Sequence, residues 1–146
     1  MKTVAEILRA KDDHEVYSIA PEASVFEAVE LMAHKNIGAL LVLEHDQIVG
    51  MFTERDYARK VVLAARASRD TPLREIMTTS VMYVGPAQTS EECMALMTEN
   101  RVRHLPVIDD GKLTGLVSIG DLVKDIISEQ KFLIEQLQHY ISGERG

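Results

Sequence analysis

The stretch GMFTERD at residues 50–56 returns as GLVSIGD at residues 115–121. In both places an apolar run containing a glycine leads to a hydroxyl residue, Thr53 or Ser118, and an aspartate follows three residues later. The pattern matches a capping box, in which a hydroxyl and a carboxylate each accept a hydrogen bond from a backbone amide at a helix start. Each stretch therefore predicts a strand that ends where a helix begins.

The two stretches belong to an internal repeat, because Gly50 falls on Gly115 at an offset of 65 residues. No gap is needed over residues 21–62, and VAEIL at residues 4–8 also matches LREIM at residues 73–77 at a slightly longer offset. A repeat of fixed period indicates one supersecondary unit built twice. Other identical pairs include Pro21 and Pro86, Leu31 and Leu96, Met32 and Met97, Leu40 and Leu105, Val42 and Val107, and Asp56 and Asp121.

Each copy predicts a short strand followed by an amphipathic helix. The strands are expected at residues 16–19 and 81–84, and Ser24 and Thr89 are suitable N-caps for the helices. The apolar residues of the helices follow the i, i+3, i+4, i+7 spacing of one buried face. They are Val25, Ala28, Val29, Met32 and Ala33 in the first copy and Cys93, Met94 and Met97 in the second.

Two β-rich runs and a final helix complete each copy. The runs read ALLVLEHDQIVGMF in the first copy and HLPVIDDGKLTGLV in the second. Asp110-Gly111 is a strong hairpin signal and His45-Asp46 a weaker one. Apolar strands buried against helices give an α+β fold, with tandem βαββα repeats packed as a pseudo-two-fold pair.

The predicted domain boundaries follow the repeat. The first repeat with an N-terminal helix takes residues 1–67, a linker residues 68–72, the second repeat residues 73–128, and a C-terminal tail helix residues 129–146, with Gly143 as its stop. We expect the tail helix to pack on its own domain, and a self-association surface is the alternative. The apolar face of the tail consists of Phe132, Leu133, Leu137, Tyr140 and Ile141.

Composition narrows the classes of function. The chain has 146 residues and a net charge of −7, which argues against a general nucleic-acid binder. Its single cysteine, Cys93, cannot form an internal disulfide, and charges interrupt the N-terminus before any signal-peptide core. No apolar run approaches the roughly 18 residues of a membrane span. We expect a cytoplasmic protein with no membrane or nucleic-acid partner.

The repeated motif has two readings. As a capping box alone, Thr53 and Asp56 would only start a helix. The recurrence of the motif and the presence of Gly120 favour a binding site as well, since glycine costs a helix about 1 kcal/mol and permits close approach of a ligand. A helix N-terminus attracts anions, and a carboxylate beside it can accept hydrogen bonds from a ribose diol.

The chain resembles the paired cystathionine-β-synthase (CBS) domains, or Bateman modules. The resemblance rests on GMFTERD and GLVSIGD, each preceded by a βαβ unit, and on LPVID at residues 105–109, and it covers about residues 4–128. In the first copy Leu41 stands where the second has Pro106. The chain is similar to stand-alone two-domain CBS proteins. The resemblance implies regulation rather than catalysis, through adenosine-containing ligands bound between the copies.

The resemblance also implies which residues bind the ligand. The motif aspartates, Asp56 and Asp121, would hold ribose, and Thr53 and Ser118 would contact ribose or phosphate. Arg103 and His104 precede the LPVID strand and would bind phosphate, whereas their counterparts Gly38 and Ala39 are small and neutral, so the two sites should differ. Ser18 and Pro106 complete the expected set.

Arg55 lies inside the first motif and could bind a phosphate bidentately, which would suit a dinucleotide such as NAD. We interpret the other basic residues of this region mainly as a solvated helix face and linker. They are Arg59, Lys60, Arg66, Arg69 and Arg74.

We therefore expect a regulatory module that binds AMP or NAD(H), or else ADP or ATP, as an energy or redox sensor, with no catalytic cofactor. A homodimer and an unidentified partner enzyme are implied by the resemblance. The alternative is a ligand-free docking module that regulates a partner enzyme. A nucleotide-processing enzyme is the second rival, but the sequence offers no P-loop, nucleophile, base or metal-ligand spacing for it.

Overall fold

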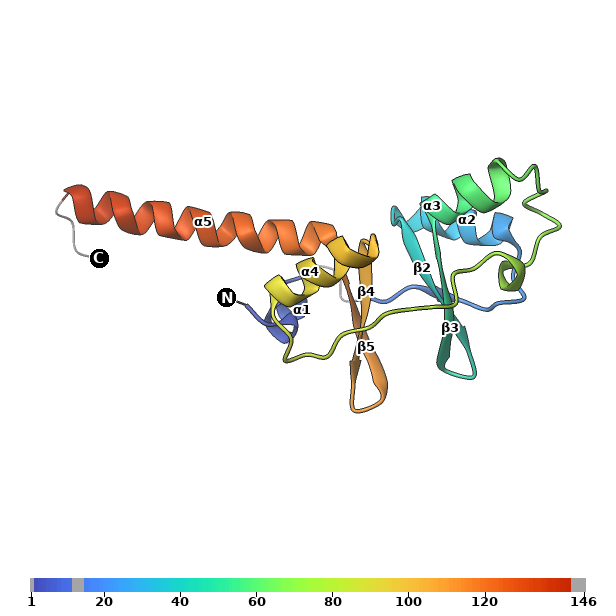
Figure 1. The fold of residues 1–146 in the computed structure, drawn as a ribbon, viewed down its shortest axis with the longest axis horizontal. Coiled ribbons are helices and arrows are strands. Elements are labelled where there is room, and N and C mark those ends of the chain that lie inside the picture. Colours follow the sequence, from blue (N-terminus) through green and yellow to red (C-terminus); the bar gives the residue numbers. More distant parts are fainter. Residues whose placement is uncertain (1, 12–14, 143–146) are drawn as a thin grey trace. The chain divides into compact units, whose positions relative to one another are not determined.

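The computed structural model describes residues 2–11 and 15–142, shown along the chain in Figure 1. The chain divides into two compact units. We call Glu15–Met82 the first-repeat unit, and Met1–His14 with Tyr83–Gly146 the second-repeat unit. Both contain helices and strands, which confirms the α+β class.

The first-repeat unit is built on a three-stranded sheet in the order β1-β2-β3. Strand β1 (Ser18–Ile19) runs parallel to β2 (Ala39–Glu44), which pairs antiparallel with β3 (Gln47–Thr53). The core lies between this sheet and helix α2 (Val25–Lys35), whose N-terminus is capped by Ser24 as predicted. The residues fully buried there include Val25, Ala28, Leu40, Val42, Phe52 and Val61.

One residue of the predicted α2 stripe is misplaced. Val25, Ala28 and Met32 are buried, but Ala33 is exposed. With 3.6 residues per turn, Ala33 lies at the edge of a stripe centred on the other three residues. The helix then ends at Asn36, whose φ of 55° gives the left-handed conformation common at helix ends.

The helix predicted after Thr53 begins as α3 (Glu54–Asp56) and continues as a π-helix (Tyr57–Val62). A short 3-10 helix (Leu73–Glu75) follows, and it also belongs to the first-repeat unit. The predicted linker lies against the start of α2, because Val25 N–H donates to the Thr71 carbonyl at 2.8 Å and Phe26 N–H to the Ser68 carbonyl at 3.0 Å.

The second-repeat unit carries a two-stranded sheet, β4 (His104–Asp109) with β5 (Lys112–Ser118). Helix α4 (Ser90–Asn100) is capped by Thr89 as predicted and buries Cys93 and Met97. The strand predicted at residues 81–84 is reduced to one parallel bridge, Val84 with Val107. The N–H of Val84 donates to the Pro106 carbonyl. Val84 alone therefore pairs with β4 in the way that β1 pairs with β2 in the first-repeat unit.

Both predicted hairpins form two-residue turns of the same kind. His45 and Asp46 have φ of 52° and 63°, and Asp110 and Gly111 have φ of 53° and 75°. Positive φ at both central residues defines the type I′ turn, whose twist matches that of paired strands. His45-Asp46, the weaker sequence signal, therefore forms the same type of turn as Asp110-Gly111.

The segment that leads into each repeat packs on the other repeat. Helix α1 (Val4–Ala10) lies in the second-repeat unit, where Val4 N–H donates to the Gln88 carbonyl at 2.8 Å. Its sequence counterpart Leu73 donates to the Ala23 carbonyl of the first-repeat unit at 2.9 Å. The sequence boundaries group this helix with the first repeat. Its hydrogen bonds instead join it to the second, because leading segments are exchanged.

The last helix, α5 (Ile119–Ser142), is one continuous helix that runs on past the β4–β5 hairpin (Figure 1). The prediction that its tail packs on its own domain is wrong for the described residues, since every side chain from Lys131 to Ile141 is exposed. The predicted stop, Gly143, lies outside the described residues.

Candidate functional site

The first motif forms a complete capping box where β3 meets α3. The N–H of Thr53 donates to Oδ2 of Asp56 at 3.0 Å, and the N–H of Asp56 donates to Oγ1 of Thr53 at 3.1 Å. The Thr53 hydroxyl also lies 3.2 Å from the same carboxylate oxygen. The capping interpretation of this motif is therefore confirmed, and any ligand role would be added to it.

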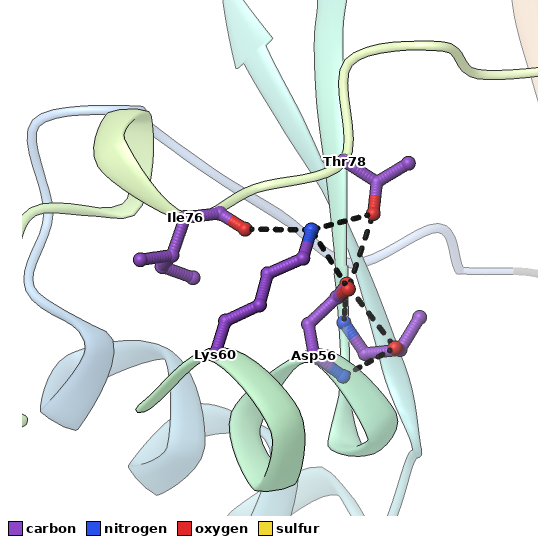
Figure 2. Close-up of polar contacts among 5 residues, drawn as sticks. Asp56, Lys60, Ile76 and Thr78 are labelled. Carbon is purple, nitrogen blue, oxygen red and sulfur yellow. Dashed lines mark hydrogen bonds and ion pairs between the residues drawn. The ribbon is translucent and has the colours of Figure 1, made fainter. Parts of the chain in front are cut away.

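The other oxygen of Asp56 is held by two residues outside the box, as Figure 2 shows. The hydroxyl of Thr78 donates to Oδ1 at 3.1 Å, and Nζ of Lys60 lies 3.3 Å from it. Lys60 also donates to the Ile76 carbonyl at 3.1 Å. Both Ile76 and Thr78 belong to the segment that leads into the second repeat, so this cluster fastens that segment to the first-repeat unit.

These contacts leave Asp56 with little capacity for a ligand. A carboxylate has about four acceptor positions, and Asp56 is buried with protein donors on both oxygens. A ribose hydroxyl that bound Asp56 would have to displace Thr78 or Lys60. The arrangement is that of a structural carboxylate that could bind a ligand only by exchanging partners.

The second motif repeats the box between β5 and α5. The N–H of Ser118 donates to Oδ2 of Asp121 at 2.8 Å, and the N–H of Asp121 donates to Oγ of Ser118 at 3.2 Å. A lysine from the N-terminal segment completes it: Nζ of Lys11 lies 3.0 Å from Oδ2 and donates to the Leu116 carbonyl at 2.9 Å. Both donors to the Asp121 carboxylate, the Ser118 N–H and Nζ of Lys11, reach the same oxygen, Oδ2.

The two motif carboxylates consequently differ. Among the residues that the structure describes, Oδ1 of Asp121 has no hydrogen-bond partner, whereas both oxygens of Asp56 are engaged. Asp121 can accept hydrogen bonds from a diol without losing a protein contact.

A cavity of about 420 Å³ opens beside Asp121, between α1 and α5. Buried Asp125 lines it, and Nζ of Lys2 lies 3.3 Å from its Oδ1. Lys124 lines the same cavity, and within residues 2–11 and 15–142 it has no ion-pair partner. The cavity therefore places an uncompensated ammonium group near a carboxylate with a vacant acceptor oxygen. The remaining lining residues are Ile7, Ala10, Lys11 and Ser128.

The structure brings the other predicted residues of the first repeat close to Thr53. Ala39 pairs with Thr53 across β2 and β3, and the Gly38 carbonyl accepts from the Glu54 N–H at 3.1 Å. Ser18 lies farther from Thr53, on β1, where it pairs with Leu41 of the intervening strand β2. Arg55 is exposed at the start of the helix. Of these four residues, Arg55 alone has a charged side chain.

The equivalent residues of the second repeat surround Ser118. His104 pairs with Ser118 across β4 and β5, and the Arg103 carbonyl accepts from the Ile119 N–H at 2.9 Å. Arg103 is exposed, His104 half-buried, and Pro106 buried within β4. The second repeat thus presents two ionisable side chains where the first presents Gly38 and Ala39.

Sequence reasoning missed the residues that hold the motif aspartates. The Asp56–Lys60 pair has the i, i+4 spacing of helical ion pairs, a signal that could have found it. Thr78 and Lys11 come from distant segments and leave no local signal. Two other basic residues of this region also bind protein groups: Arg66 pairs with Glu75, and Arg69 stacks 3.8 Å from the Phe26 ring centroid.

Arg74 is likewise engaged by protein carboxylates. Its guanidinium hydrogen-bonds to Glu22 and to Glu44, and these bonds raise its pKa above the ordinary value. Because it faces two carboxylates of its own unit, Arg74 is unsuited to bind an incoming anion.

Comparison with known proteins agrees with this architecture. The family model of the CBS domain matches residues 4–63 and again residues 73–128. The chain belongs to the CBS-domain family. CBS domains are generally regulatory, and this chain carries two of them. No helix among the described residues is both long enough and apolar enough to cross a membrane.

Individual CBS proteins resemble the chain over most of its length. The mitochondrial CBS domain-containing protein CBSX3 of Arabidopsis thaliana is 36% identical over 97% of this chain and 72% of its own. A solved CBS-domain protein from Burkholderia ambifaria is 58% identical, with a TM-score of 0.86 over 88% of this chain and 96% of that one. A hexameric CBS-CP12 protein from bloom-forming cyanobacteria is 30% identical, with a TM-score of 0.73 over 83% and 70%.

Proposed function

We propose that this CBS-domain pair binds an adenine nucleotide and regulates a partner according to the energy or redox state of the cell. AMP and NAD(H) are the leading candidates, with ADP and ATP as further ones. One observation on the described part of the chain carries the proposal: Oδ1 of Asp121 has no hydrogen-bond partner there, and the cavity beside Asp121 is lined by Lys124, which has no ion-pair partner there. The single cysteine suits the reducing cytoplasm in which such nucleotides circulate.

The chemistry of the second-repeat unit suits a nucleotide. A carboxylate can accept two hydrogen bonds from a ribose diol, as the acidic residue of dinucleotide sites does. Lysine binds phosphate as a point charge, and Lys124 is the ammonium group available for it. In this proposal Asp121 holds the ribose, Ser118 and Lys124 lie toward the phosphate, and Arg103 and His104 extend the basic side.

The first-repeat unit would bind a ligand less readily. Ligand binding to Asp56 would compete with Thr78 and Lys60, which fasten the segment leading into the second repeat. A ligand shifts a conformational equilibrium only by the difference in its affinity for the two states. Occupation of Asp56 would therefore favour a state in which that segment is released. Within the motif at residues 53–56, Arg55 is the basic residue that could bind a phosphate.

Self-association and an unidentified partner enzyme belong to the same proposal. The CBS-CP12 relative is a hexamer, and regulation by shape requires a surface that the ligand can alter. We propose a homodimer as the minimal assembly of this chain.

A ligand-free docking module is a second candidate, favoured by one observation. Both motifs form complete capping boxes, and a lysine pairs with each motif carboxylate. The motif residues therefore have a structural role even without a ligand. In this case the protein would regulate a partner enzyme by contact alone.

Binding and its absence can be distinguished by mass spectrometry of small molecules that co-purify with the protein, followed by calorimetric titration with AMP, ATP and NAD. Asp121→Asn should weaken binding, while Asp46→Asn, in the exposed β2–β3 turn, should leave it unchanged. Failure of every adenine nucleotide to bind would reject the sensor and favour the docking module. Turnover of the nucleotide by purified protein would instead indicate an enzyme.

A further inference from the structure

The residue four positions after each motif aspartate has opposite charge in the two repeats. At the offset of 65 residues, Lys60 falls on Asp125. Residues four apart lie on the same face of a helix, so each of these residues lies beside its own motif aspartate. Asp56 therefore has an ammonium group as its neighbour, whereas Asp121 has a second carboxylate.

This difference decides which oxygens of the motif carboxylates remain free. In the first-repeat unit, Nζ of Lys60 lies 3.3 Å from Oδ1 of Asp56, which also accepts a hydrogen bond from the Thr78 hydroxyl at 3.1 Å. In the second-repeat unit the ammonium group comes instead from Lys11, and it lies 3.0 Å from Oδ2 of Asp121, the oxygen that the capping box already uses. Oδ1 of Asp121 is thereby left without a hydrogen-bond partner among the described residues.

Asp125 is an unfavourable residue for stability at this position. It is 5% exposed, and neither of its carboxylate oxygens accepts a hydrogen bond within residues 2–11 and 15–142. Lys2 lies near it as an ion pair, with Nζ 3.3 Å from Oδ1. A buried carboxylate that lacks hydrogen bonds costs stability, and two acids four residues apart on a helix repel each other. Proteins break such rules mainly at functional sites, so Asp125 points to a role beyond stability.

The charge reversal does not extend to the preceding position. Arg59 falls on Lys124 at the same offset, and both side chains are exposed bases. Each repeat therefore keeps a basic residue three positions after its motif aspartate, and the second repeat follows it with an acid. A lysine at position 125 would lie beside Asp121 as Lys60 lies beside Asp56.

We infer that Asp125 is a positioning residue that makes the second repeat the nucleotide-binding one. It keeps the place beside Asp121 free of an ammonium group, so that Oδ1 can accept a hydrogen bond from a ribose hydroxyl. Asp125 acts through Asp121 and does not contact the ligand, because both of its oxygens are buried. Lys60 has the opposite role and keeps Asp56 closed, so each chain should bind one nucleotide. The inference rests on the proposed function.

The test is calorimetric titration of the full chain with AMP, ADP, ATP and NAD. In Asp125→Lys the affinity should fall by about tenfold or more, because the new ammonium group competes for Oδ1 of Asp121. Attraction between the added charge and a phosphate would have the opposite effect, so a fall in affinity is specific to this competition. Gln136→Lys, in the exposed tail of α5, adds a lysine to the same helix and should bind as the wild type does. Asp125→Asn adds no ammonium group and should also keep the affinity.

A second variant keeps the test decisive if circular dichroism shows that Asp125→Lys unfolds. Lys60→Met removes the ammonium group beside Asp56 and should allow a second nucleotide to bind per chain. Equal affinities of Asp125→Lys and Gln136→Lys would overturn the inference, as would an unchanged stoichiometry in Lys60→Met or two bound nucleotides in the wild type. A loss of affinity in Asp125→Asn would also overturn it, since Asp125 would then contact the ligand itself. A wild-type protein that binds none of the four nucleotides would instead reject the proposed function, and the inference with it.

Discussion

The side chain of Leu8 fills the space that a β-carbon on Gly115 would occupy, with Cδ1 only 2.9 Å from that position. Met77 fills the equivalent space at Gly50, where its sulfur would lie 2.6 Å from an added β-carbon. Each glycine thus lets the leading segment of the other repeat reach the surface of its hairpin.

These two glycines predict unequal costs for the same substitution. Gly50→Ala would also press on the Thr78 carbonyl at 2.9 Å, which is fixed by its hydrogen bond to Met51, so about 1–3 kcal/mol of stability should be lost. Gly115→Ala meets only the flexible end of Leu8 and should cost less than half as much. Denaturant unfolding of both variants measures the difference, and equal losses would contradict this account of the contact.

Substitution of the two motif aspartates should affect protein stability and nucleotide binding to different extents. Asp56→Asn removes a buried charge paired with Lys60 and should cost about 1–3 kcal/mol of unfolding free energy. Asp121→Asn should cost less, because its protein contacts use one oxygen, and under the proposed function it should lose more nucleotide affinity.

Paired thermal unfolding and calorimetric titration of the two variants provide the measurements. Asp109→Asn, an exposed carboxylate at the end of β4, serves as the control for a lost charge. The reverse order, with affinity lost mainly in Asp56→Asn, would show that a ligand displaces Thr78 or Lys60 readily.

Gly120 offers a test of why the second motif contains a glycine. A β-carbon there would meet nothing closer than Oγ of Ser118 at 3.6 Å, so Gly120→Ala should raise stability by up to about 1 kcal/mol. If a ligand approaches the backbone at this point, the same variant should bind nucleotide more weakly. Thr98→Ala, exposed on α4 and outside the lining of the cavity, controls for helix propensity. Unchanged affinity in Gly120→Ala would rule out close approach as the reason for the glycine.

Local features of the fold were predictable because their causes are local. The N-caps at Ser24 and Thr89 and the turns at His45-Asp46 and Asp110-Gly111 depend on residues within a few positions of one another. The repeat made each prediction twice, which supported the weaker member of each pair. The capping role of Thr53 followed in the same way.

The partners of the motif aspartates were not predictable from one sequence. Lys11 reaches Asp121 across 110 positions, and Thr78 reaches Asp56 across 22, so neither contact leaves a periodic signal. The exchange of leading segments hid them further, since the sequence order places Lys11 in the first repeat, whereas Asp121 belongs to the second. The extent of α5 was predictable from its period, but its exposure depends on which other elements reach it.

Cys93 should resist modification while the protein is folded. Burial in α4, followed by the negative charge of Glu92, raises the pKa of its thiol above the ordinary 9.0. Because the thiolate is favoured in the unfolded chain, this contribution to stability is intact below that value and is lost as the pH rises through the higher folded pKa. Alkylation at neutral pH should therefore be slow in native protein and fast in denaturant. Cys93→Ala should lose stability from the smaller side chain but show a weaker decline at alkaline pH. Rapid alkylation of native protein would mean that α4 opens readily.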